Sequence, residues 1–131
     1  MIVLDASVLI AYLDADDVHH GAADALLAAE VDDDYGASSL TLAEVLVVPA
    51  RQGRLPATCA ALAALEVAEL AFPADTAVKL AQLRAATGLK MPDCCVLLAV
   101  ETEGARLASF DDRLASAAAA RRIETVQTPT S

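Results

Sequence analysis

Four acidic side chains stand where the chain turns from an apolar run into a helix, or just inside a helix. They are Asp5, Glu44, Asp93 and Asp111. Two unit charges about 4 Å apart repel by roughly 4 kcal/mol at an effective dielectric of about 20, so four ionised carboxylates in one pocket require a compensating cation. Carboxylate oxygens, without cysteine or paired histidine beside them, select hard ions such as Mg²⁺ or Mn²⁺. Such an ion activates water and stabilises a phosphodiester transition state, which indicates metal-assisted phosphodiester hydrolysis.

These acids can converge only if the elements around them form a parallel sheet. Residues 2–4 are a short apolar run with branched side chains, typical of a strand buried on both faces. Extended runs alternate with helical segments and no connection is a hairpin turn, which predicts an α/β fold with helices on both faces of a parallel sheet. The expected strands are 2–4, 35–39, 69–72, 106–109 and 123–126; the expected helices are 7–13, 18–30, 40–48, 56–67, 75–88, 92–103 and 111–120. Pro49 is expected to end or kink the third helix.

The expected topology brings most of the acids to one edge of the sheet. Asp5 and Asp111 follow strands, and Glu44 lies in the first turns of the helix after the second strand. In open α/β sheets, ligands bind at the carboxyl ends of the strands. Asp93 opens the apolar helix that precedes the fourth strand, so it reaches this edge only if the loop before it crosses over.

Each acid also has a purely structural interpretation. Asp5 and Asp111 fit helix N-caps, Thr41 and Glu44 have the spacing of a capping box, and Asp93 complements a helix dipole. The coincidence of four such acids at one edge favours a shared site over four separate caps.

Composition limits the class of protein. The 131 residues fit a single domain, 1–131, with residues 127–131 as a frayed tail, and the 56% apolar content excludes disorder. The net charge of −10 argues against a broad nucleic-acid footprint and against an anionic membrane surface. The three cysteines, Cys59, Cys94 and Cys95, form no disulfide framework. Without a basic leader or a membrane-length apolar run, a cytoplasmic location is expected.

The segments around the acids resemble a known family. Val-Leu-Asp-Ala-Ser-Val-Leu-Ile at 3–10, Leu-Ala-Glu-Val at 42–45, Met-Pro-Asp-Cys at 91–94 and Leu-Ala-Ser-Phe-Asp-Asp-Arg-Leu at 107–114 look like the four acidic motifs of PIN-domain ribonucleases. The match is closest to the VapC toxins of bacterial toxin–antitoxin pairs and spans Ile2 to about Val126. The resemblance implies a three-layer α/β/α fold with sheet order 3-2-1-4-5. It also implies a Mg²⁺- or Mn²⁺-dependent endoribonuclease acting on structured RNA such as tRNA or rRNA, a cognate VapB-type antitoxin, and homodimerisation.

The resemblance also assigns roles to individual residues. Asp5 and Asp93 match the principal metal ligands, while Glu44 and Asp111 match the remaining acids, which bind metal directly or through water and position the attacking water. Ser7 matches the small hydroxyl residue that steadies the first acid. A further serine, Ser109, stands where many members have threonine. No histidine has a catalytic role in the family, which agrees with an interpretation of His19 and His20 as surface residues at a helix start.

The acidic charge leaves few groups to hold RNA. The candidate cations are Arg51, Arg54, Lys90, Arg106 and Arg113. With so few phosphates neutralised, we expect a shallow salt dependence of RNA binding. A basic antitoxin tail would be attracted to the same acidic surface.

Two other functions remain open from the sequence. Another Mg²⁺-dependent phosphohydrolase of the haloacid-dehalogenase type would carry a second Asp two residues after the first, where this chain has Ser7. A receiver-like or purely interacting domain pairs its acids with a Lys near the last strands, and no Lys follows Lys90. Metal-dependent RNA cleavage, phosphomonoester hydrolysis, or neither would separate these functions.

Overall fold

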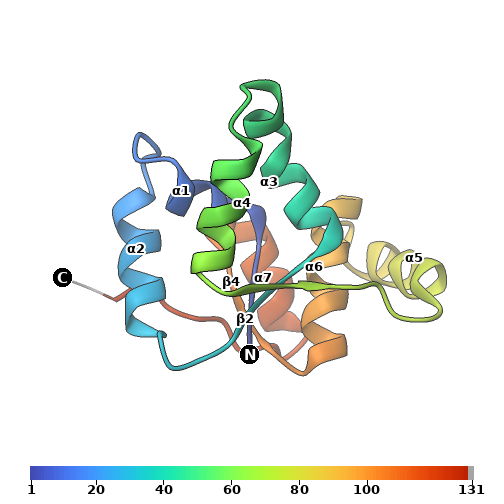
Figure 1. Cartoon of the computed structure of the whole chain (residues 1–131). Helices are drawn as coiled ribbons and strands as arrows, with labels where there is room; N and C mark the ends of the chain where they lie inside the picture. Colours follow the sequence, from blue (N-terminus) through green and yellow to red (C-terminus); the bar gives the residue numbers. More distant parts are fainter. Residues whose placement is uncertain (130–131) are drawn as a thin grey trace.

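A parallel sheet forms the centre of the computed structural model, which describes residues 1–129 (Figure 1). The strands are β1 Ile2–Leu4, β2 Tyr35–Ser38, β3 Val67–Leu70 and β4 Arg106–Ala108, in the order β3-β2-β1-β4. In register, Ile2 pairs with both Tyr35 and Arg106, and Leu4 pairs with Ala108. The carboxyl ends of β1 and β4 therefore lie side by side, as the sequence predicts.

The expected fifth strand is reduced to a single parallel bridge between Leu107 and Thr125. The N–H of Leu107 donates to the carbonyl of Glu124 at 3.0 Å, and the N–H of Val126 donates to the carbonyl of Leu107 at 2.8 Å. This segment lies next to β4, where the order 3-2-1-4-5 places it, but it makes too few ladder bonds to count as a strand. The predicted tail at 127–131 has no regular structure over 127–129, and residues 130–131 lie outside the described part of the chain.

Seven helices of the described residues connect the strands. They are α1 Ala6–Leu13, α2 His20–Ala29, α3 Ser39–Arg51, α4 Leu55–Ala64, α5 Thr76–Thr87, α6 Met91–Glu103 and α7 Asp112–Ala120. Helix α3 continues two residues beyond Pro49, so Pro49 does not end it. Helix α4 ends earlier than expected, and Glu66 turns the chain with a positive φ of 60°, which moves β3 two residues toward the N-terminus.

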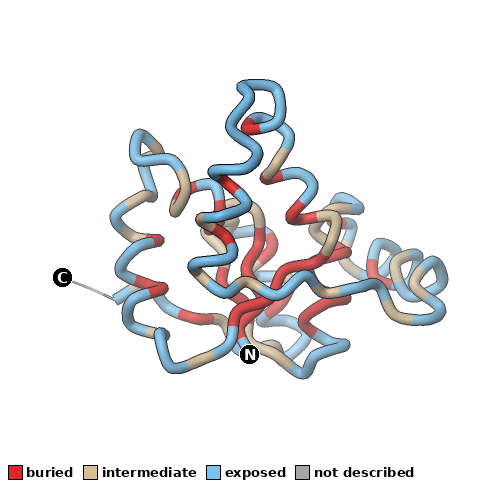
Figure 2. Tube along the Cα trace, viewed as in Figure 1, coloured by how far each residue is buried: buried red, intermediate tan, exposed pale blue. Residues whose placement is uncertain are grey.

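Two apolar cores flank the sheet, because successive strand residues point to opposite faces. Ile2 and Leu4 belong to the core shared with α1, α2, α3 and α4, whereas Val3 belongs to the core shared with α5, α6 and α7. Figure 2 shows the buried residues gathered along the strands and on the inner faces of the helices. The protein is thus a three-layer α/β/α fold, with α6 buried throughout residues 94–100 as its apolar sequence predicts. No helix within residues 1–129 is long and apolar enough to cross a membrane.

Candidate active site

The most enclosed acid of the molecule is Asp5, which directly follows β1 and is only 5% exposed. It is the N-cap of α1, and its Oδ1 accepts from the N–H of Val8 at 3.2 Å and from the hydroxyl of Ser7 at 2.6 Å. Its Oδ2 accepts from the hydroxyl of Ser109 at 2.5 Å. Three donors therefore fix the orientation of a carboxylate that burial would otherwise leave poorly solvated.

Both serine hydroxyls also hold the loop that follows β4. Ser7 Oγ accepts from the N–H of Phe110 at 3.0 Å, and Ser109 Oγ accepts from the N–H of Asp111 at 3.0 Å. Each hydroxyl donates to Asp5 and accepts from the loop backbone, so the β4–α7 loop and the β1–α1 turn form one hydrogen-bonded unit. Both serines predicted to support the first acid are thus in hydrogen-bond contact with Asp5.

The carboxylate of Asp111 is the N-cap of α7. Its Oδ1 accepts from the N–H groups of Arg113 at 2.9 Å and Leu114 at 3.1 Å. The capping interpretation is therefore correct for Asp111, as it is for Asp5. Asp111 can cap α7 and still bind a metal ion. A carboxylate has about four lone-pair sites, and both cap bonds use the same oxygen, Oδ1, so Oδ2 stays available.

The third aspartate of the site, Asp93, lies in the first turn of α6 after Pro92 and is half-buried. Burial is the main cause that raises its pKa, and the charges of Asp111 and Asp5 raise it further. The pKa of Asp5 is likewise raised above 3.8, first by burial and to a smaller extent by Asp111, against the lowering effects of its hydrogen bonds to Ser109, Ser7 and Val8. The charges of Asp5 and Asp111 thus act on Asp93, so the start of α6 lies near the two aspartates that follow β1 and β4.

The fourth acid, Glu44, occupies a different position. It lies exposed in the second turn of α3, whose N-cap is Ser38 and not Thr41, so the capping box expected between Thr41 and Glu44 does not form. Its charge contributes to the raised pKa of Cys95 on α6, two residues beyond Asp93. The structure therefore leaves Glu44 on the rim of the aspartate cluster.

A groove of about 670 Å³ begins at Glu44 and runs between α1, α3 and α4. Its apolar lining includes Ile10, Val48 and Pro49, and Arg54 lies at the start of α4. Glu44 thus lines this groove, whereas none of the three aspartates of the site does.

Two of the five candidate cations lie beside the aspartates. Lys90 and Arg113 both lower the pKa of Asp93, which opposes the effect of the neighbouring acids. Arg113 also donates to the carbonyl of Gly88 at 3.4 Å, so its side chain bridges the loop before α6 and the start of α7. Of the five candidate cations, these two therefore lie near the aspartates.

The remaining cations lie elsewhere. Arg51 is in the last turn of α3, and Arg54 donates to Oε1 of Gln52 at 2.9 and 2.5 Å. Arg106 pairs with Glu30 and Asp33 at 3.0 Å each, at the amino end of β4. The structure does not bring Arg106 to the acidic site, because the first residue of a strand lies at the opposite edge of the sheet from its carboxyl end.

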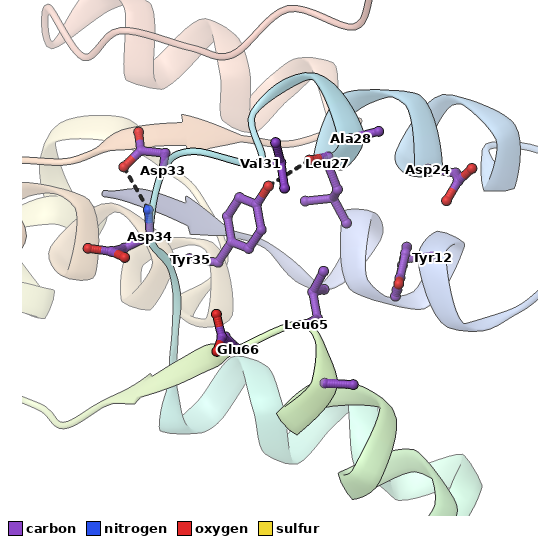
Figure 3. A pocket seen from close by; sticks show the side chains of 11 residues that line it. Tyr12, Asp24, Leu27, Ala28, Val31, Asp33, Asp34, Tyr35, Leu65 and Glu66 are labelled. Carbon is purple, nitrogen blue, oxygen red and sulfur yellow. Dashed lines mark hydrogen bonds between the residues drawn. The ribbon is translucent and has the colours of Figure 1, made fainter.

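A second hollow of about 320 Å³ lies at that amino edge (Figure 3). Tyr35 opens β2 there and donates its hydroxyl to the carbonyl of Leu27 at 2.7 Å, and Asp33 accepts from the N–H of Asp34 at 2.8 Å. Although Asp24, Asp33, Asp34 and Glu66 line it, this hollow is separate from the aspartate cluster.

The donor chemistry of the cluster fits a hard divalent cation. Within residues 1–129 no three His, Cys, Asp or Glu side chains already stand close enough together to enclose an ion. Mg²⁺ is commonly held by only one or two carboxylates and keeps several waters, so a closed protein cage is not required. The buried carboxylate of Asp5 and the repelled carboxylate of Asp93 would both gain from such a charge.

One contact near the acids was not anticipated from the sequence. The ring of His19 stacks on the ring of Phe110 with centroids 4.9 Å apart and planes at 22°. His20 is also structural, since its Nδ1 lies 2.7 Å from the carbonyl of Ala11. In the sequence, the one indication that Phe110 could lie near the site was its position between two predicted site residues, Ser109 and Asp111.

The protein is therefore a three-layer α/β/α fold with an acidic site, formed by three neighbouring aspartates, at the carboxyl edge of its parallel sheet. The model of the family described as PIN domain matches residues 2–120. The chain belongs to the PIN domain family. No curated protein sequence gives a significant match.

Solved structures share this fold. FitAcB from Neisseria gonorrhoeae is similar with a TM-score of 0.73 at 19% identity over 98% of each chain. VapC20 from Mycobacterium tuberculosis, described as a toxin that cleaves the sarcin–ricin loop, gives 0.70 at 21% identity over 89% of this chain and 95% of that one. A toxin–antitoxin complex from Klebsiella pneumoniae gives 0.69 at 21% identity over 85% and 87%. At these identities the likeness concerns the fold.

Proposed function

We propose that this protein is a VapC-type toxin: a Mg²⁺- or Mn²⁺-dependent endoribonuclease that hydrolyses RNA phosphodiester bonds at its aspartate cluster. The observation that carries the proposal is the buried carboxylate of Asp5 at the carboxyl edge of the sheet, which Ser109 joins by hydrogen bonds to the loop of Asp111. Asp93 lies close enough for the charges of both aspartates to raise its pKa, which Lys90 and Arg113 lower. Membership of the PIN domain family supports it, as does the shared fold with a protein described as an RNA-cleaving toxin.

Asp5 and Asp93 would hold the divalent ion. The other two acids, Asp111 and Glu44, would bind it directly or through water. When bound, the ion would activate water and stabilise the negative charge of the phosphate. The chain itself supplies orientation and charge. Ser7 and Ser109 fix both oxygens of Asp5 through their hydroxyls. Arg113 and Lys90 offer N–H donors for the phosphate of the substrate, while the exposed carboxylate of Glu44 can accept a proton from the attacking water.

The proposal includes partners. A cognate antitoxin with a basic segment is expected, because the net charge of −10 attracts positive charge and an arginine could pair with the aspartates in place of the metal. The fold is shared with chains from toxin–antitoxin complexes, which supports such a partner. We further propose a homodimer in the cytoplasm, to be tested by sedimentation of the purified protein and by fractionation of cells.

Cleavage of RNA by the purified protein tests the activity. Structured and single-stranded RNA are incubated with Mg²⁺, Mn²⁺ or EDTA, with Asp5→Asn and Asp93→Asn as inactive variants. Asp112→Asn is the matched control, because Asp112 is an exposed acid next to Asp111 in the first turn of α7. We expect cleavage that requires metal, disappears in both inactive variants and persists in the control.

Three outcomes would contradict the proposal. Cleavage that survives EDTA or Asp5→Asn would exclude a carboxylate-held metal. Hydrolysis confined to small phosphomonoesters would indicate a phosphatase. No activity on either substrate, together with a tight protein partner, would indicate an interaction module.

A further inference from the structure

The stacked pair of His19 and Phe110 connects two parts of the chain next to the acids. His19 immediately precedes α2, and Phe110 lies in the β4–α7 loop. Phe110 is half-buried and packs on the core shared by α1 to α4, whereas His19 is exposed. The pair is therefore a layered arrangement in which the core supports Phe110, Phe110 supports the imidazole, and the imidazole remains accessible from solvent.

Hydrogen bonds place this pair firmly beside Asp5. The N–H of Phe110 donates to Ser7 Oγ at 3.0 Å, and the Ser7 hydroxyl donates to Asp5 at 2.6 Å. On the other side, the N–H of His19 donates to Oδ1 of Asp17 at 2.8 Å. The ring of His20 is held at the end of α1 by the carbonyl of Ala11. The rings of His19 and Phe110 are thus already stacked on each other in the protein without a ligand.

A supported aromatic ring with accessible surface is suited to a flat, unpaired base. Proteins that bind single-stranded RNA stack bases on aromatic, histidine and arginine side chains, which requires little charge and tolerates any base. That matters in a chain with a net charge of −10, where phosphate contacts are few.

We propose that His19 and Phe110 form a nucleobase-binding site, at which one unpaired base next to the scissile phosphate stacks on the imidazole of His19. This inference rests on the proposed ribonuclease function. It adds a contact to the base, whereas the aspartates, Lys90 and Arg113 would act on the metal and the phosphate. The bound RNA would therefore be single-stranded, or in a loop, at the cleaved position.

The experiment measures RNA binding and base stacking separately from cleavage. Short single-stranded oligoribonucleotides carry a fluorescent adenine analogue, or an abasic residue, at each position in turn. Binding is followed by anisotropy in Ca²⁺, a hard oxygen-binding ion with less strict geometry than Mg²⁺, and intact RNA is verified on gels. Cleavage is followed in parallel in Mn²⁺.

The variants are His19→Ala, His19→Tyr and Phe110→Leu, with Val18→Ala as the matched control. Val18 lies on the same loop and is 89% exposed. We expect His19→Ala to weaken RNA binding roughly 5- to 150-fold, the range for loss of one stacked base, and to abolish quenching of the analogue at one position. His19→Tyr should retain both signals, Phe110→Leu should reduce both, and Val18→Ala should change neither.

An abasic residue provides the decisive comparison. At the stacked position it should weaken binding to the wild-type protein but not to His19→Ala, because both changes remove the same contact. If the wild-type protein binds and cleaves these RNAs while His19→Ala binds equally well, the base site is refuted and the ribonuclease stands. If the wild-type protein neither binds nor cleaves RNA, the ribonuclease is refuted and the base site with it.

Discussion

Removal of the Ser109 hydroxyl tests how the site keeps a buried carboxylate ionised. This hydroxyl donates to Asp5 Oδ2 at 2.5 Å and accepts from the N–H of Asp111 at 3.0 Å. It is the strongest of the contacts that lower the pKa of Asp5. Ser109→Ala removes both hydrogen bonds without adding bulk, and of the two only the bond to Asp5 changes in strength with the charge of that carboxylate.

The expected loss of stability follows from the charge of the acceptor. A hydrogen bond to a charged group contributes about 1.5–3 kcal/mol, and one between neutral groups about 0.5–1.5 kcal/mol. Above the pKa of Asp5, Ser109→Ala should therefore lower the free energy of unfolding by about 1.5–3 kcal/mol. For a domain of this size the midpoint of thermal unfolding should fall by roughly 5–15 °C.

The difference between the two proteins should depend on pH. Without the Ser109 hydroxyl the pKa of Asp5 rises further above its ordinary value of 3.8, so the variant takes up this proton at higher pH than the wild type. The advantage of the wild type is thus fully present above the higher pKa of Asp5 in the variant, and it is partly lost as pH falls from there through the pKa of Asp5 in the wild type. Below both values only the hydrogen bond to the neutral carboxyl, worth roughly 1 kcal/mol, should remain.

Urea unfolding over a series of pH values from about 8 downward provides the assay, provided that both proteins show one cooperative transition. Ser116→Ala is the control, since Ser116 is exposed on α7 and its removal should change stability by less than about 0.5 kcal/mol. A loss below about 0.5 kcal/mol for Ser109→Ala at about pH 8, or the same loss across the whole series, would refute the assigned role of this hydroxyl.

Three further predictions follow from the charges. Asp93→Asn should raise the thermal midpoint at about pH 8, where its repulsion by Asp5 and Asp111 is relieved, while RNA cleavage is lost; an unchanged midpoint would show that the repulsion is negligible. Arg106→Ala should raise the pKa of Asp33 from about 2 toward 3.8, so that Asp33 contributes less to the loss of stability as pH decreases over this interval. NMR titration of Asp33 measures the shift, and a value still near 2 would contradict the prediction. The logarithm of RNA affinity should fall with the logarithm of salt concentration with a slope no steeper than about −2, because few phosphates meet a cation; a slope of about −5 would indicate many more contacts.

Much of the fold was predictable because its signals are local. The apolar run at Ile2–Leu4 and the acid directly after it are both read from neighbouring residues, and a parallel strand order then puts the carboxyl ends of β1 and β4 together. The pairing of Leu4 with Ala108 brings Asp5 and Ser109 into hydrogen-bond contact. The weak fifth strand and the shifted β3 were missed, because the ends of short strands depend on partners that sequence periodicity does not specify.

Sequence reasoning placed Glu44 in one site with the three aspartates, whereas in the structure it lies exposed on α3. Asp93, in the first turn of α6, lies near enough to Asp5 and Asp111 for their charges to raise its pKa. Glu44 remains exposed on the rim, because the cap at Ser38 fixes where α3 begins and hence which way each residue of the helix points. A helix turns about 100° per residue, so an uncertainty of one or two residues in its start changes the direction of a side chain completely.

The sequence alone determined the order of strands and helices, the oxygen chemistry of the acids and the edge at which Asp5 and Asp111 emerge. These follow from hydrophobic patterns and from the right-handed parallel connections of an α/β fold. Tertiary structure alone decided that Asp93 joins them, that Arg106 pairs with acids at the far edge, and that His19 stacks on Phe110. Such contacts join residues far apart in the chain, and only the packing of whole elements brings them together.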